Sequence, residues 1–464
     1  MFYLPFYLLF LSFTSLQCTN SKPELDQQDN IVATIGNTFI TSDEFITNYE
    51  FGFAHLKSPI NPKLSYLNTM INEKLLSLDG YENNVHLKNI IQNKKNDLSR
   101  DLLIEYLIKE EVKESITITD SEIKDAINKS KVSFNMRYWA HNNLEIVNQT
   151  YDKIREVGFE RFIQNIIESN QDLNLSQEQF ETGYVTWLTI PPELVEKIQD
   201  LPIKKISEPV QFGGKYWIFE IIDIRREGIL DSEYFSRAES FRKILFQNKL
   251  SDATTNYVSS LMTQKDVRTK MESFKYLSNI VWKWLTSDSE GKLKFEQYLH
   301  THLNVNFENM KNNLLISTTD SQISINDFIQ SFDFFRLQKD FSNKNAMMQQ
   351  LNLEIAWFIR DKYLVKTALD KQINTSPDFK RELELWIDKW VYEESRRSFS
   401  PRELSLKLNE LKTTYPVKID TTLLNSLEVT GSIKSRWLTV HNYKMGTNRM
   451  AIPIADGSWK LSHN

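Results

Sequence analysis

The amino-acid sequence predicts an α+β protein that is mainly helical, with one small α/β domain between helical units. The 464 residues include only 12 glycines and 12 prolines, and so few helix breakers favour long helices over a turn-rich sandwich. Strand-like alternation of apolar residues is concentrated between residues 131 and 228. Because a chain of this length can bury several cores, we expect about two to four domains.

The composition is that of a folded protein without a nucleic-acid partner. Hydrophobic residues make up 41% of the chain and charged residues 25%, which is ordinary for a globular protein. The formal net charge of -5 provides no basic excess for binding a phosphate backbone. We therefore expect partners to be held by apolar and polar contacts rather than by bulk charge.

The N-terminus has the character of an export signal. Residues 1–17 carry no charged side chain, but this run is shorter than the about 20 apolar residues that span a bilayer, and it contains Pro5. Two interpretations remain open, a cleaved secretory signal and a lipoprotein signal that ends at Cys18. Cys18 is the only cysteine, so it cannot form an internal disulfide, and lipidation would explain its presence. The polar residues 19–29 are typical of a flexible tether.

A helical unit is expected over residues 30–130. It opens with two short strands around Gly36-Asn37. Thr41 follows, with Glu44 three residues later, which predicts a capping box and the start of a helix. Apolar residues at helical spacing continue to about 112, and Thr119 with Glu122 predicts a second capping box.

Residues 131–228 show a different pattern of apolar residues. Strand-like and helix-like stretches alternate in the order β-α-α-β-α-β, which predicts a small α/β domain. A helical connector is expected over 229–307.

The second half of the chain repeats the order of the first helical unit. Residues 308–415 resemble 30–130, and each matched pair repeats a physical device, namely a cap, an amphipathic helix and a second cap. The matched pairs are Thr41 with Ser324, Ile71 with Ile359, and Thr119 with Ser400. Duplication explains the common order, and chance similarity between helical stretches is the alternative. The remaining residues, 416–464, are expected to be an extended C-terminal segment.

The middle domain resembles the parvulin-type, or PpiC-like, peptidyl-prolyl isomerases. The resemblance lies in the order of five degenerate motifs, MRYWAH, REVGFERF, GYVTWL, IPPELVEKI and LPIKKISEPVQFGGKYWIFEIIDIR. Together with the flanking helical units, this order resembles the layout of SurA-like and PrsA-like exported chaperones. The resemblance implies that the helical units form a body that binds unfolded clients.

The resemblance also implies a peptide-binding face in the middle domain. The positions of the two family histidines are occupied by Tyr138 and Trp217. The implied peptide-binding residues are Tyr138, Val185, Leu188, Ile190, Leu194 and Trp217. Tyr138 and Trp217 are either plain core aromatics or a stacking surface for a peptide. His141 lies three residues after Tyr138, so alternation along the strand predicts that it faces the other side and enters a loop.

No cofactor or metal is predicted. His300 and His302 are spaced as metal ligands could be, but no nearby acidic or thiol residue completes a site. The motifs of serine hydrolases, zinc proteases and phosphate-binding loops do not occur.

The leading functional expectation is an exported chaperone of the periplasm, anchored to a membrane through a lipid on Cys18. It would bind unfolded envelope or outer-membrane proteins, with weak or absent prolyl isomerase activity. Two alternatives stay open: an active parvulin-type prolyl isomerase, and a scaffolding lipoprotein of an envelope complex.

Overall fold

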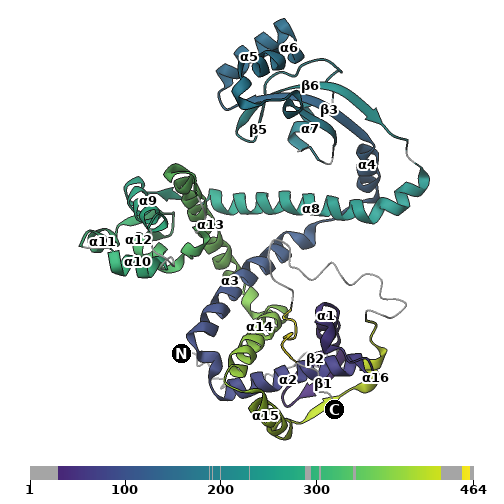
Figure 1. Ribbon diagram of the computed structural model, residues 1–464, viewed down its shortest axis with the longest axis vertical. Helices are drawn as coiled ribbons and strands as arrows, with labels where there is room; N and C mark the ends of the chain where they lie inside the picture. The colour runs from purple at the N-terminus through teal and green to yellow at the C-terminus, as the bar shows by residue number, and fades with distance from the viewer. Residues whose placement is uncertain are drawn as a thin grey trace, which may run out of the picture. The chain divides into compact units, whose positions relative to one another are not determined.

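The computed structural model describes residues 30–187, 189–190, 192–198, 200–228, 230–287, 294–302, 305–337, 341–429 and 452–459. Long helices dominate, and three small antiparallel sheets accompany them (Figure 1), which confirms the predicted α+β class. The chain forms two compact units, one from Met1–Tyr106 with Leu364–Asn464 and one from Leu107–Tyr363. Within the described residues, no helix is both long and apolar enough to cross a membrane.

The first unit opens with the expected hairpin. Strands β1 (Ile31–Ile35) and β2 (Thr38–Thr41) pair antiparallel, and Gly36 takes the positive φ of +53° that their turn requires. Helix α1 (Ser42–Phe51) then begins at Thr41, whose hydroxyl accepts a hydrogen bond from the Glu44 amide at 3.2 Å. The second hydrogen bond of the predicted capping box does not form. The Glu44 carboxylate binds Arg381 at 2.7 Å instead of the Thr41 amide.

C-terminal helices complete this unit. Helix α14 (Pro377–Arg396) packs along α2 (Pro62–Glu82), and a buried ion pair joins Lys74 to Asp388 between them. Helices α15 (Pro401–Thr414) and α16 (Thr421–Ser426) also contact α2.

Strand β10 (Val417–Ile419) adds to the hairpin by pairing antiparallel with β1 in the order β10-β1-β2. The predicted division of the chain at residues 130 and 307 therefore differs from the compact units. The physical reason is that the C-terminal strand and helices cover the free edge of β1 and the apolar side of α2. The segment 416–464 is not simply extended, since it includes β10 and α16.

Helix α3 (Asn89–Glu111) runs from the first unit into the second, where α4 (Asp120–Ser130) follows. The capping box predicted at α4 is confirmed: the Thr119 hydroxyl accepts from the Glu122 amide at 3.3 Å, and the Glu122 carboxylate accepts from the Thr119 amide at 2.9 Å. Helix α4 packs on the long helix α8 (Asp231–Thr263) through an apolar cluster that includes Ile127 and Phe241.

The middle domain is a four-stranded antiparallel sheet in the order β4-β3-β6-β5. Its elements are β3 (Val132–His141), α5 (Leu144–Val157), α6 (Phe159–Ser169), β4 (Glu181–Thr186), α7 (Pro192–Ile198), β5 (Val210–Phe212) and β6 (Lys215–Arg226). This is the predicted order of strands and helices with one extra short strand, β5. Helices α5 and α6 lie on one face of the sheet and α7 on the other (Figure 1), so each face has its own apolar cluster.

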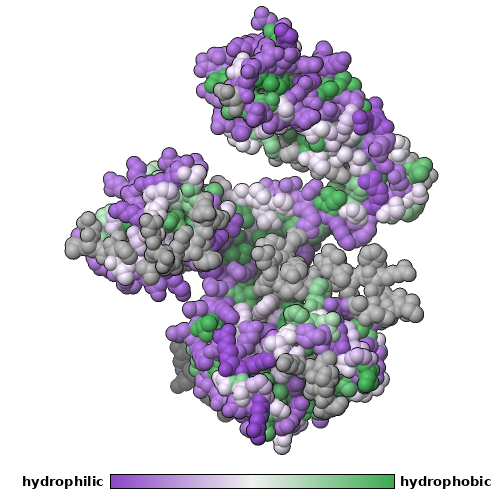
Figure 2. Space-filling view, viewed as in Figure 1, coloured by the Kyte–Doolittle hydropathy of each residue, from purple (hydrophilic) through white to green (hydrophobic). Residues whose placement is uncertain are grey.

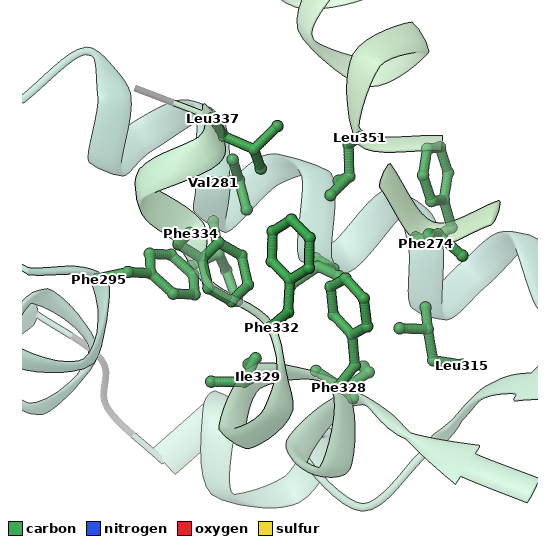
Figure 3. Packing of buried hydrophobic residues seen from close by; sticks show 14 of the residues in the cluster. Phe274, Val281, Phe295, Leu315, Phe328, Ile329, Phe332, Phe334, Leu337 and Leu351 are labelled. Carbon is green, nitrogen blue, oxygen red and sulfur yellow. The ribbon is translucent and has the colours of Figure 1, made fainter. Parts of the chain in front are cut away.

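The last part of the second unit has an aromatic core. Its elements are β7 (Arg268–Thr269), α9 (Met271–Leu285), α10 (Phe295–His302), α11 (Val305–Met310), β8 (Leu314–Ser317), β9 (Gln322–Ser324), α12 (Ile325–Ser331) and α13 (Lys344–Asp370). Figure 3 shows the rings of Phe295, Phe328, Phe332 and Phe334 gathered between these elements. The Phe295 and Phe334 rings stack with centroids 3.9 Å apart.

The two helical segments follow the same order of elements. A hairpin and a capped helix, β8-β9-α12, lead into α13, α14 and α15, as β1-β2-α1 lead into α2, α3 and α4. Between the long helices, Asn84 and Gln372 both take a left-handed conformation, with φ of +57° and +60°, before the 3-10 helices η3 (Val85–Leu87) and η8 (Ile373–Thr375). Each hairpin also receives a third strand on its first strand, β10 on β1 and β7 on β8.

Candidate peptide-binding site

Tyr138 and Trp217 lie next to each other on one face of the middle sheet. Strands β3 and β6 pair so that Tyr138 lies opposite Phe219 and Ala140 opposite Trp217. The Tyr138 and Trp217 rings therefore meet diagonally across the strands, with centroids 5.7 Å apart and planes at 51°. Trp217 also stacks on Phe219, at 5.9 Å and 4°.

The polar atoms of both aromatic residues are bound to main-chain oxygens. The Tyr138 hydroxyl donates to the Gln179 carbonyl at 3.0 Å, and the Trp217 indole N–H donates to the Phe212 carbonyl at 2.9 Å. An indole N–H is a hydrogen-bond donor only and does not ionise near neutral pH. These two residues thus present ring surface and no titratable imidazole.

Apolar side chains from β4 and α7 surround the two rings. Ile190 and Leu194 are buried in the same cluster as half-buried Tyr138, Val185 and Trp217. The structure thus brings together five of the six implied peptide-binding residues, and Leu188 lies outside the described residues.

Trp187 is an additional member that sequence reasoning missed. It packs on Phe134 with ring centroids 4.3 Å apart and is half-buried in this cluster. Alternation continued one residue past the end of β4 would have found it, because residues 185 and 187 lie two apart. The aromatic face, defined as Tyr138, Trp187 and Trp217, therefore has three half-buried rings.

His141 does not belong to this face. It ends β3, its ring stacks on Trp139 at 6.0 Å and 11°, and its Nδ1 accepts from the Asn143 amide at 3.0 Å. Trp139 packs in the apolar cluster under α5 and α6, on the other side of the sheet from Tyr138. The expectation that His141 faces away from Tyr138 and enters a loop is confirmed.

A buried charge cluster lies on that opposite side. Arg137 is buried, and its guanidinium binds Glu181 at 3.2 Å and Glu220 at 3.0 Å, so it joins β3 to both neighbouring strands. Burial raises the pKa of the Glu220 carboxyl, and Arg137 opposes that shift. A cavity of about 470 Å³ beside this cluster is lined by Lys204 and by Gly158 at the junction of α5 and α6. The two ion pairs of Arg137 link β3 to β4 and to β6, and so hold the three strands together.

Two residues singled out in the sequence, Cys18 and His302, cannot be placed in a site. Cys18 lies outside the described residues, and so does the side chain of His302. Among the described residues, no group of three His, Cys, Asp or Glu side chains is placed to hold a metal ion.

Comparison with known proteins gives a resemblance in structure alone. No protein-family model matches the chain, and no curated protein matches it. The solved structures that match include PrsA peptidylprolyl isomerases from Bacillus anthracis and Bacillus cereus and one of two SurA-like chaperones of Campylobacter jejuni. The chain resembles PrsA and SurA-like proteins.

The similarity is distant. The Bacillus anthracis protein is 16% identical over 41% of this chain and 96% of its own, and the Bacillus cereus protein is 18% identical over 59% and 98%. The Campylobacter jejuni protein is 14% identical over 52% and 100%, and the TM-score is 0.24 in all three cases.

Proposed function

We propose that this protein is an exported chaperone that holds unfolded envelope proteins, outer-membrane proteins among them, with little or no prolyl isomerase activity. The observation that carries the proposal is the aromatic face, where Tyr138 and Trp217 occupy the positions that the resemblance assigns to catalytic histidines. Their polar atoms are bound to main-chain oxygens, and their rings stay half-buried.

The chemistry of the aromatic face supports binding more than catalysis. Rotation about a prolyl bond is slow because the amide must lose resonance, and a catalyst must stabilise the twisted carbonyl with a polar network. The aromatic face offers apolar and ring surface, which suits proline-rich and unfolded segments at low entropic cost. A holdase needs only such adaptable surface, since it acts by binding the unfolded state.

Further apolar side chains are open to solvent. Figure 2 shows apolar residues in small patches among hydrophilic ones over the visible face. At the start of α8, Leu230 is 69% exposed and Phe235 is 87% exposed. Large apolar side chains at such exposure provide additional contact surface for a client.

Replacing Trp217 by alanine tests the aromatic face directly. We expect the concentration of protein that halves the aggregation of an unfolded outer-membrane barrel protein to rise roughly fivefold, equivalent to about 1 kcal/mol. The matched control is Trp139→Ala, which removes a half-buried tryptophan from the opposite side of the same sheet. Equal loss in the two variants would mean that the domain was merely destabilised, and the aromatic face would not be the binding surface.

The proposal includes a lipid anchor on Cys18, supported by the position of the only cysteine directly after the apolar run. Acyl chains contribute about 0.8 kcal/mol per buried CH₂, so two or three of them hold a protein at a membrane. We expect Cys18→Ser to move the protein from the membrane fraction to the soluble periplasmic fraction after cell lysis. Membrane association as strong as that of the unaltered chain would disprove lipidation.

A further inference from the structure

The C-terminal segment 452–459, Ile-Pro-Ile-Ala-Asp-Gly-Ser-Trp, lies in a groove of the first unit. The groove is formed by α1, α2 and α14, through Asn48, Glu73, Tyr392 and Arg396. The segment forms no regular helix or strand, yet nearly every residue from Pro453 to Trp459 has a defined partner. Residues 456–459 close a turn, in which the Trp459 amide donates to the Asp456 carbonyl at 3.3 Å, and Ala455 before the turn is buried.

Many of the groove's contacts are hydrogen bonds to main-chain atoms of the segment. The Asn48 side-chain amide donates to the Pro453 carbonyl at 2.8 Å and accepts from the Ala455 amide at 2.8 Å. The Asp456 amide donates to the Glu73 carboxylate at 2.6 Å, and the Gly457 carbonyl lies 2.7 Å from the His55 ring nitrogen. Main-chain contacts of this kind do not depend on the ligand's side chains, so they suit a site that accepts varied segments.

Side-chain contacts at the C-terminal end add selectivity. The Asp456 carboxylate accepts from Arg396 at 2.6 Å and from the Tyr392 hydroxyl at 3.0 Å. The Trp459 ring stacks on Tyr392, with centroids 6.1 Å apart and planes at 17°, and the Arg396 guanidinium lies 4.6 Å from the Trp459 ring centroid. Gly457 lies between them, and a Cβ there would lie 2.8 Å from the exposed Phe53 ring, so a larger residue would have to displace that ring. The groove therefore favours a carboxylate, then glycine, then an aromatic ring two residues later.

The groove is costly to leave without an occupant. The Glu73 side chain is 12% exposed, and one of its carboxylate oxygens accepts from both the Asp456 amide and the Trp459 indole N–H, while the other accepts from Lys389 at 2.9 Å. Burial raises the pKa of Glu73, and the hydrogen bonds from the segment counteract that shift. Withdrawal of the segment removes two of these donors, so another peptide segment that supplied them would be bound favourably.

We infer that this groove is a binding site for peptide segments that can form the same turn, and that residues 452–459 are an internal ligand that competes with them. The partner is a segment of an unfolded protein that presents an acidic residue, a glycine and, after one further residue, an aromatic ring. Its use for clients rests on the proposed chaperone function, whereas peptide binding by the groove can be measured independently. A tethered segment competes at an effective concentration on the order of millimolar, so the intact chain binds such segments weakly until its own is displaced.

The test uses the full chain and a fluorescent peptide with the sequence IPIADGSW. Asp456→Arg places a cation beside Arg396 and weakens the internal ligand only. We expect this variant to bind the peptide at least roughly tenfold more tightly than the unaltered chain, as measured by fluorescence anisotropy. The same peptide with valine in place of glycine is expected to bind more weakly, because it must displace the Phe53 ring, and Asp456→Arg combined with Asn48→Ala should lose the gain.

Two results would overturn the inference. One is a folded Asp456→Arg variant that binds the peptide no better than the unaltered chain. The other is loss of hydrogen-exchange protection throughout α2 and α14 in that variant, which would make the segment an integral part of the fold. Neither result depends on aggregation assays, so failure of the chaperone proposal and failure of the groove are distinguishable.

Discussion

Replacing Lys74 by methionine is expected to lower the local stability of the first unit by about 3–5 kcal/mol. The ammonium group of Lys74 is buried between α2 and α14 and pairs with Asp388, which also accepts from the Tyr81 hydroxyl at 2.7 Å. Methionine fills similar space but leaves the Asp388 carboxylate in a buried site without its counter-charge. Burial and the neighbouring Asp388 raise the pKa of Tyr81, so its hydroxyl remains a donor but supplies no positive charge.

The measurement is hydrogen exchange of peptides from α2 and α14, because the pair joins these two helices. Lys129→Met is the matched control, since Lys129 forms an exposed ion pair with Asp125 that is worth about 0–1 kcal/mol. Adding Asp388→Leu to Lys74→Met should restore most of the lost protection, because no unpaired charge remains buried. Equal effects of Lys74→Met and Lys129→Met would show that the pair does not hold the two helices together.

Replacing Phe328 by alanine is expected to destabilise the aromatic core of the second unit by about 3–5 kcal/mol. Phe328 is fully buried, and its ring stacks on Phe332 at 4.8 Å (Figure 3). The Phe328 ring also meets the Phe358 ring edge-on at 5.2 Å. Truncation therefore removes ring contacts on two sides and leaves a cavity that rigid neighbours cannot close.

Hydrogen exchange of β8, β9 and α12 gives the local readout for Phe328→Ala. Phe235→Ala serves as the control, because Phe235 is exposed and such a change is expected to stay within about 0.5 kcal/mol. The loss in Phe328→Ala should be confined to the second unit, which has its own core. Equal loss of protection in the first unit's β1 and α1 would contradict separate cores.

Local patterns in the sequence predict local structure well in this protein. The caps at Thr119 and Ser400 both form, because a cap depends on residues only three apart. At Thr41 the same pattern gives only half a box, because Glu44 meets Arg381, a residue far away in the chain. Long-range partners of this kind leave no periodic signal, and this is also why the return of β10 to β1 could not be predicted.

In the middle domain too, local patterns were predictable from the sequence and long-range contacts were not. Strand alternation places Tyr138 and His141 on opposite faces, and the structure confirms this through the Tyr138–Trp217 and His141–Trp139 contacts. Sequence could not show that the Tyr138 hydroxyl is bound to the Gln179 carbonyl, because a main-chain acceptor has no residue type to recognise. The groove that holds 452–459 was missed for the same reason.

The most direct test of the central claim measures prolyl isomerisation and aggregation suppression with one preparation of the unaltered protein. We expect cis-trans relaxation of a proline peptide to keep its uncatalysed time of roughly 10–100 s at 25 °C. We expect the same protein to suppress aggregation of an unfolded outer-membrane barrel protein at a molar ratio near one. Acceleration comparable to that of an active parvulin, or aggregation unchanged at several-fold excess, would contradict the proposed function.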